Sequence, residues 1–213
     1  MGEKKAHINT GLRSKLEDPK FYNFFQSIIG ANKHRNRHFK AYFPLRPNMC
    51  VLDIGCGTGI FADYVSEDVE YHGCDMEDKY IHFCNSKFKN SNKSFYKEKV
   101  GEIDREEWYG KFDFINAHGL LHHLPDSECD ILLSTSKKYL KEGGKMITVD
   151  STFHDNQSTL SRWFVSKDRG RNIKNPKEYM SFASKFFEDV EGSVDDKYSR
   201  IIPFSIYIMT LTK

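Results

Sequence analysis

Residues 51–59 of the chain read VLDIGCGTG. The apolar run that begins at Met49 is typical of a buried strand, and it ends in three alternating glycines. The apolar spacing from Thr58 to Val65 predicts the start of an amphipathic helix. Strand, glycine loop and helix together form the first turn of a nucleotide-binding α/β unit. Glycines suit this turn because it requires positive φ, and because a residue without Cβ lets a ligand lie against the backbone.

The spacing of the loop indicates which ligand it binds. A dinucleotide site uses G-x-G-x-x-G, whereas this loop has G-x-G-x-G, and Asp53 precedes its first glycine by two residues. A carboxylate there would repel a pyrophosphate, but it suits a ligand with positive charge, such as the sulfonium and ammonium of S-adenosylmethionine. Residues 51–59 thus resemble motif I of the class I (Rossmann-like) S-adenosylmethionine-dependent methyltransferases. This resemblance implies S-adenosylmethionine as cofactor, S-adenosylhomocysteine as product, and cofactor contacts at Asp53, Gly55, Cys56, Gly57 and Gly59.

Composition limits the class of protein. With 213 residues, 38% of them hydrophobic, the chain can bury one sizeable core, and we expect a single domain over residues 1–213. Because 32 basic residues balance 30 acidic ones, no strong field recruits nucleic acid or an anionic membrane. The five cysteines have no C-x-x-C spacing, which favours reduced thiols, a cytoplasmic location and no metal site. No apolar run of about 18 residues predicts a membrane span. Monomer and homodimer stay open.

Residues 1–45 are expected to form a helical lid, because methyltransferases of this class usually carry one before motif I. The pair Asp18-Pro19 predicts a helix start, and a second helix is expected from about Asn32 to Tyr42. Within the lid, Tyr22 is predicted to contact the cofactor. The basic cluster between Lys33 and Lys40 forms either a solvated helix face or an anionic substrate contact, and Arg35 is a candidate for the second role.

The second strand, Val69 to Cys74, ends at Asp75 about 20 residues after the glycine loop. A carboxylate at that strand tip can accept two hydrogen bonds from ribose hydroxyls, so Asp75 is the predicted ribose ligand, and Met76 is expected to pack on the adenine. Family members usually place an acidic residue after the third strand to bind the adenine amino group. This chain departs from that pattern and offers Glu98 or Glu102, of which Glu102 is the candidate.

The fourth strand, Phe112 to Ala117, leads into the sequence HGLLHHLPD at residues 118–126, which resembles the same segment of small-molecule methyltransferases. In doubly wound sheets the ligand lies at the carboxyl ends of the strands, so we expect Ala117 beside the cofactor. Histidine is suited to removing a proton near neutral pH. His118 is the first candidate for the catalytic base and His122 the second, while a structural role stays open for each.

Residues 151–175 form an insertion at the predicted active-site edge, far longer than the usual connection of ~2–6 residues. Arg169 and Arg171 lie in it. Arginine binds carboxylates and phosphates in a bidentate manner, so these two residues predict an acceptor with an anionic group. The alternative is that Asp168 and Arg169 only pin the loop.

The expected fold is α/β: a doubly wound, seven-stranded sheet of order 3-2-1-4-5-7-6, with strand 7 antiparallel, helices on both faces and the N-terminal lid. Strand 7 is expected to be antiparallel because the turn between Val190–Val194 and Phe204–Thr212 is too short for a crossover helix. The chain is similar to a bacterial subgroup of small-molecule methyltransferases.

We therefore predict methyl transfer from S-adenosylmethionine to a small-molecule acceptor, namely a hydroxyl of an anionic metabolite or glycan precursor. Three alternatives remain: a nicotinamide oxidoreductase, disfavoured by the glycine spacing; a tRNA or rRNA methyltransferase, through the basic cluster; and a non-catalytic S-adenosylmethionine-binding protein. The sequence Asn116-Ala117-His118-Gly119 lacks the [N/D]-P-P-[Y/F] motif common in methylation of base amino groups, which disfavours that substrate.

Overall fold

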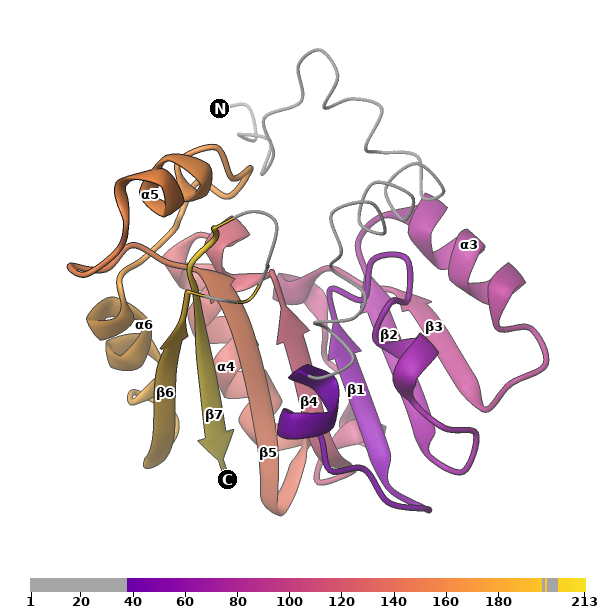
Figure 1. The fold of residues 1–213 in the computed structure, drawn as a ribbon. Coiled ribbons are helices and arrows are strands. Elements are labelled where there is room, and N and C mark those ends of the chain that lie inside the picture. The colour runs from indigo at the N-terminus through magenta and orange to yellow at the C-terminus, as the bar shows by residue number, and fades with distance from the viewer. Residues whose placement is uncertain (1–37, 197, 199–202) are drawn as a thin grey trace, which may run out of the picture.

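A computed structural model describes residues 38–196, 198 and 203–213 of the chain. Seven strands form one sheet of order β3-β2-β1-β4-β5-β7-β6 (Figure 1). The strands are β1 (Cys50–Ile54), β2 (Glu70–Asp75), β3 (Lys93–Lys97), β4 (Phe112–His118), β5 (Leu140–Ser151), β6 (Asp189–Asp195) and β7 (Ile206–Thr212). The labelled α-helices of the described ranges are α3 (Asp78–Lys87), α4 (Asp126–Tyr139), α5 (Thr159–Val165) and α6 (Pro176–Ala183). Short 3-10 helices cover Ala62–Tyr64, Val100–Glu102, Glu106–Trp108 and Leu121–His123.

The strand order and directions confirm the predicted sheet. β1 pairs in parallel with β2 on one side and with β4 on the other. β7 pairs antiparallel with both β5 and β6, as the short turn before it requires. The parallel strands therefore end at one common edge, which is where a doubly wound sheet places its ligand.

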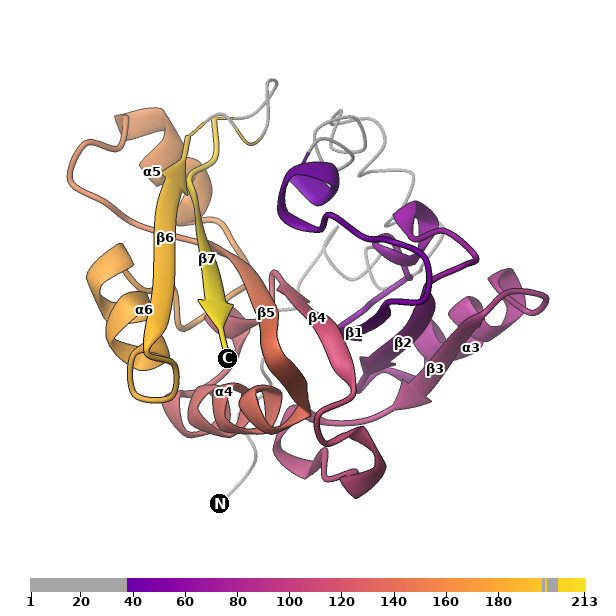
Figure 2. The same cartoon turned by 90° about the horizontal axis from the view of Figure 1, so that it is seen from below.

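Helices cover both faces of the sheet. The buried side chains of α4 and α6, among them Leu133 and Tyr179, share one apolar cluster with Leu52 and Ile115 of the central strands. On the opposite face, α3 and a helical turn at residues 38–42 pack against the sheet in a second cluster. Figure 2 shows α4 and the indigo turn at residues 38–42 on opposite sides of the sheet. That turn is the described end of the second helix expected in the lid. The rest of the predicted lid lies outside the described residues.

The segment after the glycine loop differs from the expectation of an amphipathic helix. It consists of turns followed by the 3-10 helix Ala62–Tyr64. The prediction of a regular helix was wrong: residues 60–69, which return the chain to Glu70 beside Cys50, form turns and one 3-10 helix instead. The apolar spacing instead reflects burial of Phe61, Ala62 and Val65.

Two helices follow β5, and their first residues explain where they begin. The side chain of Ser158 accepts a hydrogen bond from the N–H of Ser161 and so caps α5 inside the predicted insertion. Asn175 and Glu178 form a reciprocal capping box at the start of α6. Within the described ranges, no helix combines the length and apolar character needed to cross a membrane.

Candidate active site

The glycine loop leaves β1 and turns at three residues with positive φ: 75° at Gly55, 52° at Gly57 and 70° at Gly59. Two of these glycines differ in their surroundings. A Cβ at Gly59 would lie 2.9 Å from Cε2 of Phe88, whereas a Cβ at Gly57 would meet no atom of the described residues within 4 Å. The loop is therefore closely packed on its inner side and open at Gly57, where the backbone is accessible to a ligand. Cys56, between Gly55 and Gly57, is buried and belongs to the interior cluster.

Asp75 lies at the end of β2 and contacts the loop directly. Its Oδ2 accepts a hydrogen bond from the N–H of Gly57 at 2.9 Å, and its Oδ1 accepts one from the N–H of Glu77 at 2.9 Å. Burial raises the pKa of this carboxyl above its ordinary value. Each carboxylate oxygen has a further lone pair, so the group can still accept hydrogen bonds from a diol. Its role as the ribose ligand stays a prediction.

Asp53 lies deeper than the predicted cofactor contact requires. It is 2% exposed, and its two oxygens accept hydrogen bonds from the hydroxyl of Tyr71 and the amide of Asn116, both at 2.6 Å. Burial raises the pKa of Asp53 to about 6, although both hydrogen bonds oppose the shift. Its charge thus lies beneath the loop, where it can act on a cationic ligand over a distance. Sequence reasoning missed Tyr71 and Asn116 as partners because they come from neighbouring strands.

The predicted adenine side of the site lies beyond Asp75. Met76 is 50% exposed, as a residue that packs on a ligand can be. Glu98 accepts hydrogen bonds from the guanidinium of Arg105 at 2.5 and 3.0 Å, whereas Glu102 is exposed at the end of its 3-10 helix. Ala117 of β4 is completely buried, so its side chain is not exposed to a ligand in this structure. These four assignments stay predictions.

His118 is the last residue of β4 and lies at the carboxyl edge of the sheet. Its Nε2 lies 2.9 Å from the hydroxyl of Tyr198. The ring also packs against the helical turn at residues 38–42, with ring centres 5.8 Å from His38 and 5.9 Å from Phe39. Nothing in the sequence signals Tyr198 as a partner, because 80 residues separate it from His118.

His122 has a different environment from His118. It is 4% exposed, its Nδ1 lies 2.8 Å from Oδ1 of Asp150, and its Nε2 lies 3.3 Å from Oδ1 of Asp168. These two carboxylates raise the pKa of His122 to about 9 despite its burial. An imidazole that faces a carboxylate through both nitrogens carries both protons and has no lone pair with which to act as a base. The geometry therefore argues against His122 as the catalytic base and leaves His118 as the candidate.

The loop after α5 separates the two roles considered for Asp168 and Arg169. Asp168 does pin the loop: besides His122, it accepts hydrogen bonds from Ser151 Oγ at 2.8 Å and from the N–H of Gly170 at 2.7 Å. Arg169, by contrast, is only partly exposed and has no hydrogen bond or ion pair with any residue the structure describes. Arg171 is exposed and equally without such a contact among these residues. The predicted contacts Tyr22 and Arg35 lie outside the described residues.

Two groups of side chains in the described part bring their ligand atoms within 4.8 Å of one another, as a metal site requires: Cys50 with Glu70 and His72, and His122 with His123 and Asp168. In the first, the ammonium of Lys111 lies 2.8 Å from Glu70. In the second, the protonated ring of His122 contacts its carboxylates. Since each group already contains a cation, we assign a metal to neither.

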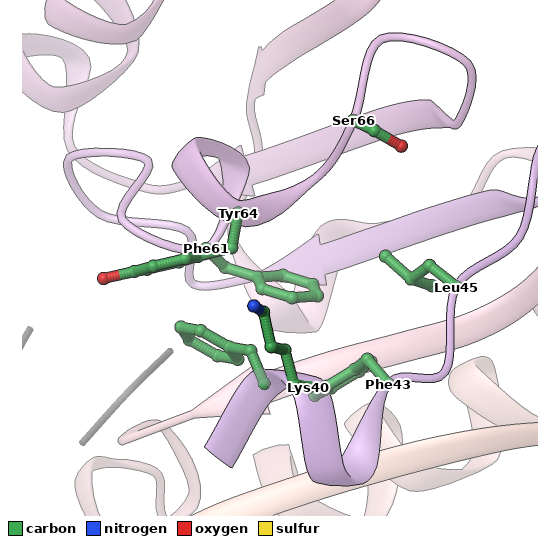
Figure 3. A pocket seen from close by; sticks show the side chains of 7 residues that line it. Lys40, Phe43, Leu45, Phe61, Tyr64 and Ser66 are labelled. Atoms are coloured by element: carbon green, nitrogen blue, oxygen red, sulfur yellow. The ribbon is translucent and has the colours of Figure 1, made fainter. Parts of the chain in front are cut away.

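A separate hollow of about 290 Å³ lies between the helical turn at residues 38–42 and the segment after the glycine loop (Figure 3). Figure 3 shows the Lys40 amine beside the ring of Phe61, with Phe43, Tyr64 and Leu45 around the hollow. None of the predicted cofactor residues within the described ranges lines it. The hollow therefore adjoins the glycine loop segment without being the predicted cofactor site.

Comparison with known proteins identifies the family. The sequence profile of a family described as "Methyltransferase domain" matches residues 29–186. Phosphoethanolamine N-methyltransferase 2 of Caenorhabditis elegans is 26% identical over 189 residues, which cover 86% of this chain and 41% of that protein. The chain thus spans less than half the length of this curated relative.

Two solved structures share the fold. Phosphoethanolamine N-methyltransferase 2 of Haemonchus contortus, in complex with phosphomonomethylethanolamine and S-adenosylhomocysteine, has a TM-score of 0.68 at 18% identity, covering 84% of this chain and 52% of that one. An S-adenosylmethionine-dependent methyltransferase from Archaeoglobus fulgidus has a TM-score of 0.70 at 19% identity, and the match covers 91% of this chain and 99% of that one.

The fold, the glycine loop and the profile define a class I methyltransferase domain of the Rossmann-like type. The chain belongs to the methyltransferase domain family.

Proposed function

We propose that the protein transfers the methyl group of S-adenosylmethionine to a small acceptor with an anionic group. The observation that carries this proposal is Arg169. Arg169 is a half-buried residue whose guanidinium has no carboxylate partner among the described residues, and it lies in a loop fastened beside the carboxyl ends of β4 and β5. A partly buried cation without a counter-ion is costly, and an anionic ligand would remove that cost. We further propose that residues 151–175 form the acceptor edge of a single domain.

His118 is the proposed base of the reaction. The acceptor atom attacks the methyl carbon in line with the carbon–sulfur bond, whose electron pair returns to sulfur and gives neutral S-adenosylhomocysteine. The acceptor proton passes to His118, whose ring Tyr198 holds through a 2.9 Å contact at Nε2. Asp53 and Asp75 act on the cofactor instead, the first through its charge and the second through ribose hydroxyls.

The methylated atom is proposed to be a hydroxyl oxygen of an anionic metabolite or glycan precursor. A second candidate is the amine of a phosphorylated amino alcohol, because the curated relative and a solved structure of the same fold are phosphoethanolamine N-methyltransferases. Both candidates share the anionic group that Arg169 would bind. They differ in the product, since an amine can be methylated more than once.

The experiment begins with calorimetric titration of the protein with S-adenosylhomocysteine and then with NAD. A radiolabelled methyl assay follows, with phosphoethanolamine, anionic sugars and small hydroxy acids as acceptors and tRNA as the nucleic-acid arm. Arg169→Ala should raise the acceptor KM about tenfold, the effect of losing a charged hydrogen bond. Arg46→Ala is the matched control, because Arg46 is exposed in the loop before β1, at the opposite edge of the sheet.

Binding of S-adenosylhomocysteine with no turnover of any acceptor would favour the non-catalytic alternative. Turnover of tRNA with a steep loss at higher salt would favour the RNA alternative. An unchanged KM in Arg169→Ala, with wild-type kcat, would remove Arg169 from the acceptor site.

A further inference from the structure

Three separate segments meet at His122. The histidine lies in the 3-10 helix Leu121–His123, Asp150 lies near the end of β5, and Asp168 comes from the loop after α5. The two ring nitrogens contact one carboxylate each, at 2.8 Å and 3.3 Å. Because this loop carries Arg169, the contact between His122 and Asp168 joins the proposed acceptor-binding residue to the sheet.

The charges of this group are nearly excluded from water. The side chains of His122, Asp150 and Asp168 are 5%, 1% and 17% exposed. Carboxylate oxygens only accept hydrogen bonds, so each ring nitrogen of His122 must donate, and the ring is a cation between two anions. Removing one partner from such a buried pair leaves an uncompensated charge, which is why the contact holds the loop strongly.

The backbone of the loop also lies directly on His122. A Cβ at Gly170 would lie 2.2 Å from Cδ2 and 2.7 Å from the carbonyl oxygen of His122, so only glycine fits there. The N–H of Asn172 donates a hydrogen bond to the same carbonyl at 2.9 Å. Arg169 therefore lies between Asp168 and Gly170, both of which are fixed by contacts at His122.

We propose that His122 is a positioning residue for acceptor binding: clamped by Asp150 to the sheet and by Asp168 to the loop, it holds Arg169 at the active-site edge. The clamp is the set His122, Asp150, Asp168 and Gly170. This proposal rests on the proposed function of Arg169 for its effect on the acceptor, but the fastening of the loop can be measured without any acceptor. His122 contributes no proton transfer.

The test uses the full 213-residue chain in four forms: wild type, His122→Asn, Gly170→Ala and the control His82→Asn. His122→Asn can keep a hydrogen bond to Asp150 but is too short to reach Asp168. Gly170→Ala removes no charged group and sets a Cβ against the ring and the carbonyl oxygen of His122, which forces the loop and the ring apart. His82 is exposed on α3, away from the clamp. Trypsin under native conditions reports on the loop, because Lys167, Arg169 and Arg171 are its cleavage sites.

Both clamp variants should be cut at these three sites about tenfold faster than wild type, because cleavage follows the population of the open loop. Both should raise the acceptor KM about tenfold while kcat and the Kd for S-adenosylhomocysteine stay within about twofold. His82→Asn should match wild type in every measurement. Where His122→Asn fails to fold, Gly170→Ala carries the test, because it retains all the charged side chains of the clamp.

Unchanged cleavage at the three sites in a folded variant would overturn the clamp. A lower kcat with an unchanged KM in His122→Asn would also overturn it, since that result assigns His122 to the reacting proton. Faster cleavage of the loop with no change in KM would uphold the fastening and refute the proposed function of Arg169 instead. Failure of the clamp therefore appears in the cleavage rates, and failure of the proposed role of Arg169 appears in the KM alone.

Discussion

The carboxylate of Asp75 accepts a hydrogen bond from the backbone N–H of Gly57 at 2.9 Å and so joins the end of β2 to the glycine loop. The same carboxylate accepts a hydrogen bond from the N–H of Glu77, which lies just before α3. One side chain thus fixes the loop and still offers lone pairs to a ligand. Replacing Asp75 tests whether its carboxylate binds a ligand as well as fixing the loop.

Replacing Asp75 by Asn should weaken binding of S-adenosylhomocysteine about 10- to 100-fold, since a charged acceptor for the two ribose hydroxyls is lost. Calorimetry measures the Kd. Asp78→Asn is the control, because Asp78 is exposed in α3 and pairs with Lys97 at the surface. Equal affinity of wild type and Asp75→Asn would remove the ribose assignment.

The glycine loop predicts opposite outcomes for two similar substitutions. Both Gly57 and Gly59 have positive φ, so alanine at either position costs about 1 kcal/mol in backbone strain. Gly59→Ala should cost a further ~1–3 kcal/mol, because its Cβ meets Phe88 and Cys84. Gly57→Ala has room in the protein, but its Cβ enters the space predicted for the cofactor.

We therefore expect Gly59→Ala to lower the free energy of unfolding more than Gly57→Ala does, and Gly57→Ala to lower the affinity for S-adenosylhomocysteine more than Gly59→Ala does. Urea unfolding measures the free energy of unfolding, and calorimetry measures the Kd for S-adenosylhomocysteine. If Gly57→Ala binds the ligand as well as wild type does, the ligand does not lie against this part of the loop.

The charge beneath the loop predicts a pH effect that distinguishes two ligands. The pKa of Asp53 is raised to about 6, so its charge appears as the pH rises from 5 to 7. S-adenosylmethionine carries a sulfonium, and S-adenosylhomocysteine carries a neutral sulfur in its place. Between pH 5 and 7 the ratio of their affinities should therefore rise about fivefold in favour of S-adenosylmethionine, as expected for charges some distance apart in a protein. Asp53→Asn should make the ratio independent of pH, and a flat ratio in wild type would refute the effect.

The proposed base gives a kinetic prediction. His118→Ala should leave the Kd for S-adenosylhomocysteine unchanged and lower kcat about 10²- to 10⁴-fold, the usual contribution of general base catalysis. Tyr198→Phe removes the hydroxyl that contacts Nε2 and should lower kcat by a smaller factor. Wild-type turnover in His118→Ala would mean that another group, or water, takes the proton.

Much of the fold could be predicted from local patterns in the sequence. Buried parallel strands are apolar runs, the glycine spacing marks the first turn, and the short link before β7 sets its antiparallel direction. The helix expected after Gly59 was wrong because apolar spacing shows which side chains are buried, as Phe61, Ala62 and Val65 are, but not whether the backbone between them is a regular helix.

The partners of the site residues could not be predicted in this way. Asn116 reaches Asp53 across 63 residues, and Tyr198 reaches His118 across 80. Such pairs depend on strand order and register, which a sequence pattern does not specify to the level of one side chain. The same limit applied to His122: the sequence showed a histidine, but not the two carboxylates that remove its capacity to act as a base.

The ion pairs of His122 predict how stability changes with pH. Its pKa is raised from 6.5 to about 9 by Asp150 and Asp168. Because the folded state binds this proton more tightly than the unfolded state does, the contribution to stability is complete below pH 6.5 and is lost as the pH rises through 9. Its size is at most about 3 kcal/mol. Asp168, whose pKa is lowered chiefly by His122, loses its own contribution only below its ordinary value of 3.8.

Urea unfolding at pH 6.5, 7.5 and 9 should show the free energy of unfolding falling more steeply for wild type than for His122→Asn. Cysteines and other groups that titrate in both proteins change the free energy of unfolding equally, so their effect cancels in the difference between wild type and His122→Asn. The groups that face His122 are Asp150 and Asp168, and the ring of His123 lies tilted against it with ring centres 4.2 Å apart, so Asp168→Asn should flatten the same slope. If wild type and His122→Asn fall in parallel from pH 6.5 to 9, the ring is neutral in the folded protein. One of its nitrogens would then be free to accept a proton, and the case for His122 as the base would reopen.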